Sequence, residues 1–426
     1  MPSGSSFRVA QWRILFATMF CYLFFYTGRQ TFGFAIPGIQ EDLGISKATL
    51  GWAGTFLLWS YAIGQAINGN LGDKFGGRRM MSFGAVASCI MNWVVSFGSG
   101  VFSVIVPWSI NGYFQAMGWA PGSRVLSNWW GKNERGRVYG LYVFAAGLSS
   151  VLSYVTSLLV IDTFELGWRW IFRLPVLLLL LGGTVYFVVA RDRPQQLGFE
   201  PPTDDDTASG DDNPSKCDEN ESSADRYRHV LSNWRFMIAS IAIGFQNLAR
   251  YGLIFWVPVH FLGADWKSSE DKWVSLALPL GMALGAVTSG WVSDRIFQGK
   301  RWPLISLFMF LAALSSLGMY FIPRDNHGLG LIVLFCCGFF AYGPQSAFWA
   351  LCPDLLGHRR AGTGTGVMNF HAYLFAGLGE PMIGSFIESN KIANSAGEMV
   401  DNTGLVFLIV MVACLASSLT SLFIRR

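Results

Sequence analysis

The sequence GNLGDKFGGRR, residues 69–79, decides the fold, because a related version of it occurs a second time as GWVSDRIFQGKR, residues 290–301. Both stretches combine glycine, aspartate and basic residues between two long apolar segments. The aspartates Asp73 and Asp294 are 294 − 73 = 221 residues apart. Glycines allow helices to approach closely, and an aspartate can hold a helix end or a basic neighbour. We therefore expect two copies of a conformational hinge, formed by Gly69, Asp73, Arg78, Asp294 and Arg295.

Apolar segments on either side of these hinges are long enough to cross a membrane. Of the 426 residues, 52% are hydrophobic and 14% are charged, against about 25% charged in ordinary globular domains. A net charge of +4 is too small to indicate a nucleic-acid partner. Blocks of about 20 apolar residues span a hydrocarbon core of roughly 30 Å. We expect an all-α membrane protein with twelve transmembrane helices in two pseudo-symmetric six-helix bundles, at residues 11–36, 47–71, 79–98, 101–128, 136–161, 168–190, 234–262, 272–293, 302–322, 328–352, 361–388 and 403–424.

A polar stretch between the sixth and seventh segments divides the chain into parts. We expect a bundle at 1–191, a linker at 192–232 and a second bundle at 233–426. The linker contains Pro201-Pro202 and Asp204-Asp205-Asp206 and cannot form a core, so we interpret it as flexible. Basic residues gather in alternate loops, and by the positive-inside rule both termini and the linker are cytoplasmic.

Two arginines within apolar segments repeat the same spacing. Arg29 and Arg250 are 250 − 29 = 221 residues apart, as the aspartates are. An arginine inside a membrane costs a few kcal/mol or more, so each should face a cavity or a counter-charge. In parallel repeats the binding site is expected where the halves meet. Two guanidinium groups on one cavity would bind an oxyanion in bidentate fashion, which favours phosphate.

Other polar residues accompany these arginines at helical spacing. Tyr22 and Tyr26 precede Arg29 by seven and three residues, which would place all three on one helix face. Tyr61 and Gln65 share a face of the second segment, and a simple interhelical hydrogen bond is the alternative role for this pair. Glu380 would neutralise an arginine or carry a proton, and a carboxylate at a helix end is the alternative for it. The complete set of expected binding residues is Arg29, Arg250, Tyr22, Tyr26, Tyr61, Gln65, Asn247 and Tyr373, with Glu380 and His371 as coupling or counter-charge residues.

Several short motifs resemble those of one family, the organophosphate:phosphate antiporters of the major facilitator superfamily. They are Tyr26-Thr27-Gly28-Arg29, residues 118–124 with Asn128-Trp129-Trp130, Glu134-Arg135-Gly136, residues 191–198, Ala249-Arg250-Tyr251-Gly252 and Tyr342-Gly343-Pro344.

The resemblance implies alternating-access exchange of an organic phosphate, a sugar phosphate or a three-carbon phosphate, for inorganic phosphate. Arg29 and Arg250 would bind the phosphoryl group, and Tyr22, Tyr26 and Tyr61 would line the pocket. It also implies a bacterial inner membrane, with an endomembrane of a eukaryotic cell as the alternative. We expect a monomer with small anionic substrates and lipid as its partners.

Two positions depart from the family pattern. A lysine of the second segment is Gln65 here, and a histidine of the fifth segment is Ala146. The carbon skeleton of the substrate therefore stays open. A proton-coupled symporter of a sugar acid or carboxylate and a transporter-like sensor of sugar phosphates are the alternatives. The sequence shows no nucleophile–base pair, metal-ligand cluster or P-loop, so we expect neither an enzyme nor a cofactor.

Overall fold

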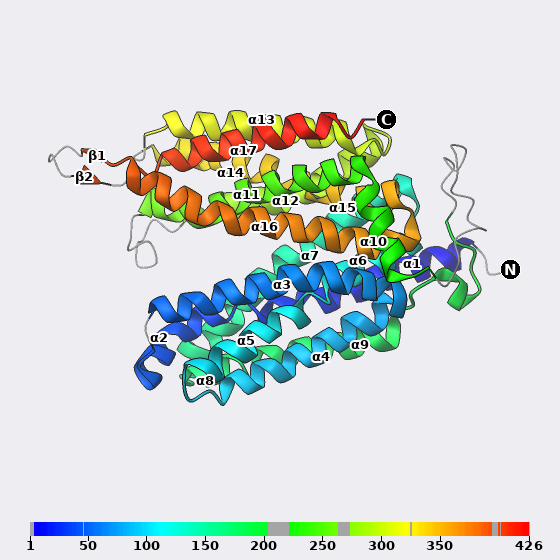
Figure 1. Ribbon diagram of the computed structural model, residues 1–426, viewed down its shortest axis with the longest axis horizontal. Coiled ribbons are helices and arrows are strands. Elements are labelled where there is room, and N and C mark those ends of the chain that lie inside the picture. The colour runs from blue at the N-terminus through cyan, green and yellow to red at the C-terminus, as the bar shows by residue number, and fades with distance from the viewer. Residues whose placement is uncertain are drawn as a thin grey trace. The chain divides into compact units, whose positions relative to one another are not determined.

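A computed structural model describes residues 4–45, 47–202, 221–262, 273–323, 326–393, 399–400 and 402–425. Nearly all of these residues are helical, and they form two compact units (Figure 1). The first unit comprises Met1–Asn233 with Cys352–Phe370, and the second comprises Trp234–Leu351 with His371–Arg426. The expected ranges 1–191, 192–232 and 233–426 stay predictions. The acidic residues expected at 204–206 of the linker lie outside the described part.

Long helices that pack pairwise make up the first unit. Contacts join α3 with α5, α4 with α5 and α9, and α1 with α7 and α9. Small residues allow these close approaches: a Cβ atom at Gly112 of α5 would lie 2.4 Å from the Leu57 carbonyl oxygen of α3. The elements are α1 (Gly4–Leu23), η1 (Phe25–Gly28), α2 (Phe32–Leu43), α3 (Lys47–Phe75), α4 (Gly77–Ser96), α5 (Val101–Gln115), α6 (Trp119–Trp129), α7 (Lys132–Leu158), the π-helix η2 (Leu159–Thr163), α8 (Trp168–Ile171), α9 (Pro175–Val189), η3 (Pro194–Leu197), α10 (Ser223–Ser232) and η5 (His358–Arg360).

The second unit repeats this mode of packing. Its closest pairs are α12 with α14, α13 with α17, and α11 with α17. A Cβ atom at Gly281 would lie 2.1 Å from the Phe335 carbonyl oxygen, so α12 and α14 touch along a glycine face. The elements are α11 (Trp234–Leu262), α12 (Trp273–Arg295), α13 (Arg301–Phe321), α14 (His327–Tyr342), α15 (Gln345–Leu356), α16 (Ala361–Ser389), α17 (Leu405–Leu422) and the paired strands β1 (Ile392–Ala393) and β2 (Met399–Val400). The end of α15 from Cys352 and the start of α16 up to Phe370 belong to the first unit.

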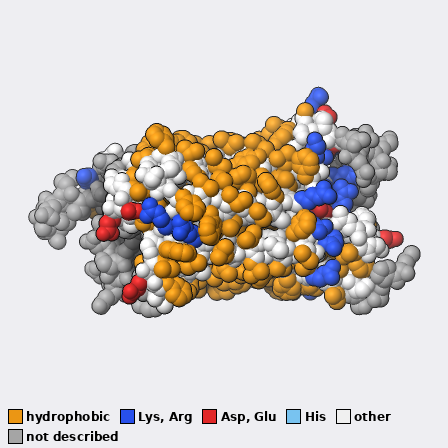
Figure 2. Space-filling view, turned by 90° about the horizontal axis from the view of Figure 1, so that it is seen from below, with side chains coloured by type: hydrophobic (Ala, Val, Ile, Leu, Met, Phe, Trp, Pro, Cys, Tyr) orange, Lys and Arg blue, Asp and Glu red, His pale blue; other side chains and the backbone are white. Residues whose placement is uncertain are grey.

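Apolar side chains cover the outside of the helices. Phe102 is 82% exposed and Phe321 is 73% exposed, which suits contact with lipid rather than water. Hydrophobic side chains occupy the middle of the face in Figure 2, and charged side chains gather toward its two ends. By length and composition alone, six described helical stretches could cross a membrane: Ser6–Ile36, Lys132–Ile161, Trp168–Val189, Arg301–Phe321, Gly328–Leu356 and Leu405–Leu422.

The structure differs from the expectation in several places. The expected spans 101–128, 168–190 and 328–352 are each divided between two helices, α5 and α6, α8 and α9, and α14 and α15. The first expected span, 11–36, is not one continuous helix: α1 ends at Leu23, a 3₁₀ turn covers Phe25–Gly28, and α2 begins at Phe32. The expected flexible linker contains the helix α10, so residues 223–232 are structured. Ser222 provides the reason for α10, because its hydroxyl accepts the Asp225 N–H at 3.2 Å and caps the helix N-terminus.

Candidate anion-binding site

Arg29 lies where the first membrane span is broken. The residue follows the 3₁₀ turn η1 with φ −141° and ψ −20°, outside the helical region. Its N–H still donates to the Tyr26 carbonyl oxygen at 3.1 Å. Discontinuous helices are the places where membrane proteins present polar groups to a ligand. The break therefore puts a charged side chain where a regular helix would have continued.

Aromatic rings surround the Arg29 guanidinium group. Its central carbon is 4.0 Å from the ring centroid of Tyr26 and 4.7 Å from that of Tyr61. The Tyr22 ring lies 5.9 Å from Tyr26, centroid to centroid. Cation–π contact stabilises a desolvated guanidinium while leaving its charge in place. The structure thus brings together the expected residues around Arg29, although the expected reason, a shared face of an unbroken helix, is wrong.

Further aromatic residues, which were not among the expected binding residues, stand behind Tyr22. Trp119 of α6 and Tyr142 of α7 lie 5.2 and 5.1 Å from its ring, and they stack on each other at 4.3 Å. Trp119 begins α6 directly after the Gly118 turn. This cluster fixes the orientation of Tyr22 from two other helices.

Gln65 lies one helical turn after Tyr61 on α3. Its side chain is fully buried. Neither atom of its amide has a hydrogen-bond partner among the described residues. A buried amide without partners costs about 1–3 kcal/mol, so the binding role expected of Gln65 remains a reasonable prediction. Ala146, the other departure from the family pattern, is buried in α7.

Arg250 stands in an unbroken helix, α11. Its guanidinium carbon is 4.3 Å from the Tyr342 ring centroid and 5.0 Å from that of Tyr251. The Tyr373 ring lies 6.0 Å from Tyr251, so this expected residue belongs to the same group. Tyr342, at the end of α14, completes it. Each arginine therefore contacts two tyrosine rings, although Arg29 follows a helix break and Arg250 lies within a continuous helix.

The other residues expected near Arg250 have different surroundings. The Asn247 side chain donates at 3.0 Å to the Ile243 carbonyl oxygen and to the Gln246 amide oxygen. Gln246 in turn donates to the Ala341 carbonyl oxygen at 2.8 Å. This arrangement joins α11 to α14. His371 is half-buried in α16, and the side chain of Glu380 lies outside the described ones.

Asp73 of the expected hinge caps a helix. Its carboxylate accepts the Gly362 N–H at 3.0 Å and both the N–H and the hydroxyl of Thr363 at 2.6 Å. Arg124 of α6 pairs with the same carboxylate at 2.8 Å. An anion at the N-terminus of α16 complements the helix dipole. A Cβ atom at Gly69 would lie 2.3 Å from the Gly362 carbonyl oxygen, so only glycine permits this approach.

The remaining hinge residues stabilise nearby helix ends. The Arg78 N–H donates to Asp192 at 2.8 Å, which caps α4, and its Nε donates to the Phe187 carbonyl oxygen at 2.6 Å. In the second copy Asp294 forms an ion pair with Arg301. Arg295 is the exposed last residue of α12. The two copies thus use their aspartates differently.

Residues 18–380 match the family model of the Major Facilitator Superfamily. The chain belongs to this superfamily. The crystal structure of FucP, a superfamily transporter in the outward conformation, is similar to this fold with a TM-score of 0.66 and 12% sequence identity. The match covers 97% of this chain and 99% of the FucP chain. The expected fold class, an all-α membrane protein with the major facilitator fold, is confirmed, and the chain is a superfamily transporter-type protein rather than an enzyme.

Sequence relatives of this superfamily member include phosphate-ester transporters. A probable hexose phosphate transport protein of Chlamydia trachomatis is 30% identical over 86% of the chain and 83% of its own length. The glycerol-3-phosphate transporter of Bacillus subtilis is 29% identical over 83% and 80%. The membrane sensor protein UhpC of Salmonella typhimurium is 26% identical over 87% and 84%. The resemblance to the organophosphate:phosphate antiporter family is therefore confirmed.

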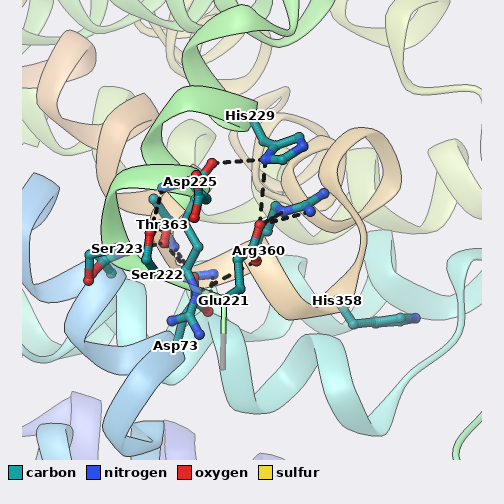
Figure 3. A network of polar contacts seen from close by, with 12 residues as sticks. Asp73, Glu221, Ser222, Ser223, Asp225, His229, His358, Arg360 and Thr363 are labelled. Carbon is teal, nitrogen blue, oxygen red and sulfur yellow. Dashed lines mark hydrogen bonds and ion pairs between the residues drawn. The ribbon is translucent and has the colours of Figure 1, made fainter. Parts of the chain in front are cut away.

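One polar network of this major facilitator protein was not expected from its sequence (Figure 3). Glu221, just before α10, lies 2.9 Å from Arg360, 3.7 Å from Arg226 and 3.5 Å from His229. The Ser223 hydroxyl donates to Asn70 of α3 at 2.6 Å. The Tyr227 hydroxyl donates to the Ala66 carbonyl oxygen at 2.8 Å, and burial raises the pKa of this phenol, so it keeps its proton. Within the first unit, α10 is therefore attached to α3 and to the segment before α16.

Proposed function

We propose that the protein exchanges an organic phosphate for inorganic phosphate by alternating access, with Arg29 and Arg250 binding the phosphoryl group. One observation carries the proposal: each unit holds an arginine whose guanidinium carbon lies within 5.0 Å of two tyrosine rings. These arginines occupy equivalent positions, since 250 − 29 = 221 also separates the two hinge aspartates.

Chemistry at the two arginines suits a phosphate ester. A guanidinium group offers a planar set of donors that matches two oxygens of a phosphoryl group. The tyrosine rings stabilise each cation without neutralising it, so the charge stays available for an anion. The same charge balance favours exchange. We expect the protein to switch between its inward-open and outward-open states more readily when an anion is bound to the two arginines than when the site is empty.

The relatives support a phosphorylated substrate. Their names specify hexose phosphate and glycerol 3-phosphate, and both include a phosphate monoester. Gln65 and Ala146 replace groups that would carry charge in the family pattern, so we assign recognition of the organic part to neutral donors and acceptors. Gln65 is the first candidate, because its buried amide has both kinds of group.

Exchange in proteoliposomes tests the proposal. Vesicles loaded with inorganic phosphate should take up labelled phosphate, and external glucose 6-phosphate, glycerol 3-phosphate or phosphoglycerate should compete for entry. Empty vesicles should take up little, and a protonophore should not change the rate. Uptake that needs no internal phosphate and stops with the protonophore would establish proton symport, in which His371 or Glu380 could carry the proton.

A sensor is the second candidate, because one relative is the membrane sensor protein UhpC. A sensor would bind the same phosphate ester through the same arginines but would turn over slowly. Substrate binding to the purified protein without measurable exchange would favour it.

We also propose a monomer in the bacterial inner membrane with both termini cytoplasmic. The basic residues Arg78, Arg135 and Arg359 would then lie on the cytoplasmic side. Fusions of a periplasmic reporter enzyme after residue 202 and after the C-terminus should be inactive, and a fusion after Gly44 should be active.

A further inference from the structure

Backbone groups at the break of the first span need hydrogen-bond partners. Residues 24–31 leave the regular α-helical pattern, in which each N–H and C=O would satisfy its neighbours. No water is available in hydrocarbon to replace those bonds, so groups at a break need partners from the protein or from a water-filled cavity. The residues that supply them here come from α4, α5 and α7.

Two asparagines hold the Gly28 carbonyl oxygen. Asn111 of α5 donates to it at 2.7 Å, and Asn92 of α4 donates at 3.0 Å. Asn111 is fixed in turn, because its amide oxygen accepts the Ser88 hydroxyl at 2.6 Å. Gln115 donates to the same Ser88 oxygen at 2.7 Å. This connected set is fully buried or nearly so, which makes each bond strong and each misplacement costly.

Two serines hold the Tyr26 peptide groups from the other side. The Tyr26 N–H donates to the Ser149 hydroxyl oxygen at 3.1 Å. The Ser153 hydroxyl donates at 3.1 Å to the Tyr26 carbonyl oxygen, which also accepts the Arg29 and Gln30 N–H groups at 3.1 and 2.9 Å. Both serines are fully buried and lie one turn apart on α7. The residues just before Arg29 are therefore held by three helices.

We propose that Asn92, Asn111, Ser149 and Ser153 are positioning residues for substrate binding, because they keep the first span broken and so hold Arg29 between Tyr26 and Tyr61. The inference rests on the proposed function of Arg29. Without these partners a continuous helix is the better way to satisfy the Gly28 carbonyl and the Tyr26 N–H. Closing the break would rotate Arg29 about the helix axis, since each residue of an α-helix turns by roughly 100°. The guanidinium group would then turn away from the Tyr61 ring of α3, while Tyr26, three residues earlier, would stay its neighbour on the same helix.

Serine variants in the reconstituted full-length protein test the inference. Ser149→Ala and Ser153→Ala should each raise the half-saturating concentration of inorganic phosphate about fivefold, the effect of one net hydrogen bond. Ser149→Thr and Ser153→Thr keep a hydroxyl group and should restore it. Ser157→Ala is the matched control, because its hydroxyl donates at 2.8 Å to the Ser153 carbonyl oxygen of its own helix. Maximal exchange rate and melting temperature should stay close to wild type in all five.

Each result decides the question. Alanine variants with unchanged half-saturation overturn the inference, and so do variants that lose rate and melting temperature without a change in half-saturation, which indicates a purely structural role. Asn111→Asp is a second probe of the Gly28 carbonyl, because it removes the donor and keeps the shape. Arg29→Lys belongs in the same series. If it leaves half-saturation unchanged, the proposed function fails and the inference fails with it; if it alone has an effect, only the positioning role fails.

Discussion

Replacing Asp73 by asparagine removes one charge from a buried site and keeps its shape. The Asp73 side chain is 0% exposed and that of its partner Arg124 is 6% exposed. The carboxylate accepts four hydrogen bonds, from Arg124, Gly362 N–H and the two donors of Thr363. An asparagine has one acceptor oxygen, and its NH₂ group would face a donor. The substitution therefore leaves a buried guanidinium group without its carboxylate and part of the α16 N-terminus without its cap.

Losing one partner of a buried ion pair costs about 3–5 kcal/mol. At about 2 °C per kcal/mol for a long chain, the melting temperature should fall by roughly 6–10 °C. A thiol-reactive dye can follow unfolding in detergent, because Cys21, Cys337 and Cys414 are buried and would react only when the helices separate.

Asp42→Asn is the matched control for this measurement. Asp42 pairs with Arg169, and these side chains are 45% and 36% exposed. Exposed ion pairs contribute little to stability, so the melting temperature of this variant should equal that of the wild type. A loss for Asp73→Asn no larger than for Asp42→Asn would refute the assignment of Asp73 as a buried cap.

Three further substitutions have definite expectations. Glu221→Gln should weaken the attachment of α10, so residues 223–232 should exchange amide hydrogens faster by mass spectrometry, and an unchanged rate would contradict the network. Gly69→Ala should lower the melting temperature because its Cβ would lie 2.3 Å from a carbonyl oxygen, whereas Gly54→Ala on the same helix meets nothing within 4 Å and should be neutral or slightly stabilising. Tyr26→Leu removes a ring 4.0 Å from the Arg29 guanidinium and should raise half-saturation about threefold or more, while Tyr26→Phe should match the wild type; equal effects would rule out the cation–π contact.

Sequence alone predicted the fold class because its signals are local. Apolar runs predicted the membrane spans, and the repeated glycine–aspartate motif predicted two halves. The same spacing predicted that Arg29 and Arg250 occupy equivalent positions. Helical spacing also identified Tyr26 beside Arg29, and the aromatic contact survives in the structure because the 3₁₀ turn keeps the two residues close.

The break at Arg29 could not be predicted in the same way. Residues 24–31 contain no proline, and the run 27–31 with its single glycine, Gly28, does not by itself end a membrane helix, because transmembrane helices tolerate glycine. The groups that hold the break open lie 64 to 127 residues away in the chain. Nothing in one sequence shows that Asn92 and Ser153 meet the same turn. The helix α10 did have a local signal, because Ser222 followed three residues later by Asp225 is a capping pattern, but the acidic composition of the surrounding stretch concealed it.

Equilibrium binding of labelled inorganic phosphate to the purified protein tests the central claim most directly. Arg29→Lys and Arg250→Lys should each weaken binding by about a hundredfold or more, as expected for the loss of a bidentate charged contact worth about 3 kcal/mol. Arg173→Lys is the control, because that guanidinium carbon lies 4.8 Å from the Phe97 ring and its Nε donates to Ser96 at 2.9 Å, outside both arginine sites. Its phosphate affinity should equal that of the wild type. Wild-type affinity in either Arg29→Lys or Arg250→Lys would contradict a phosphate site built from the two arginines.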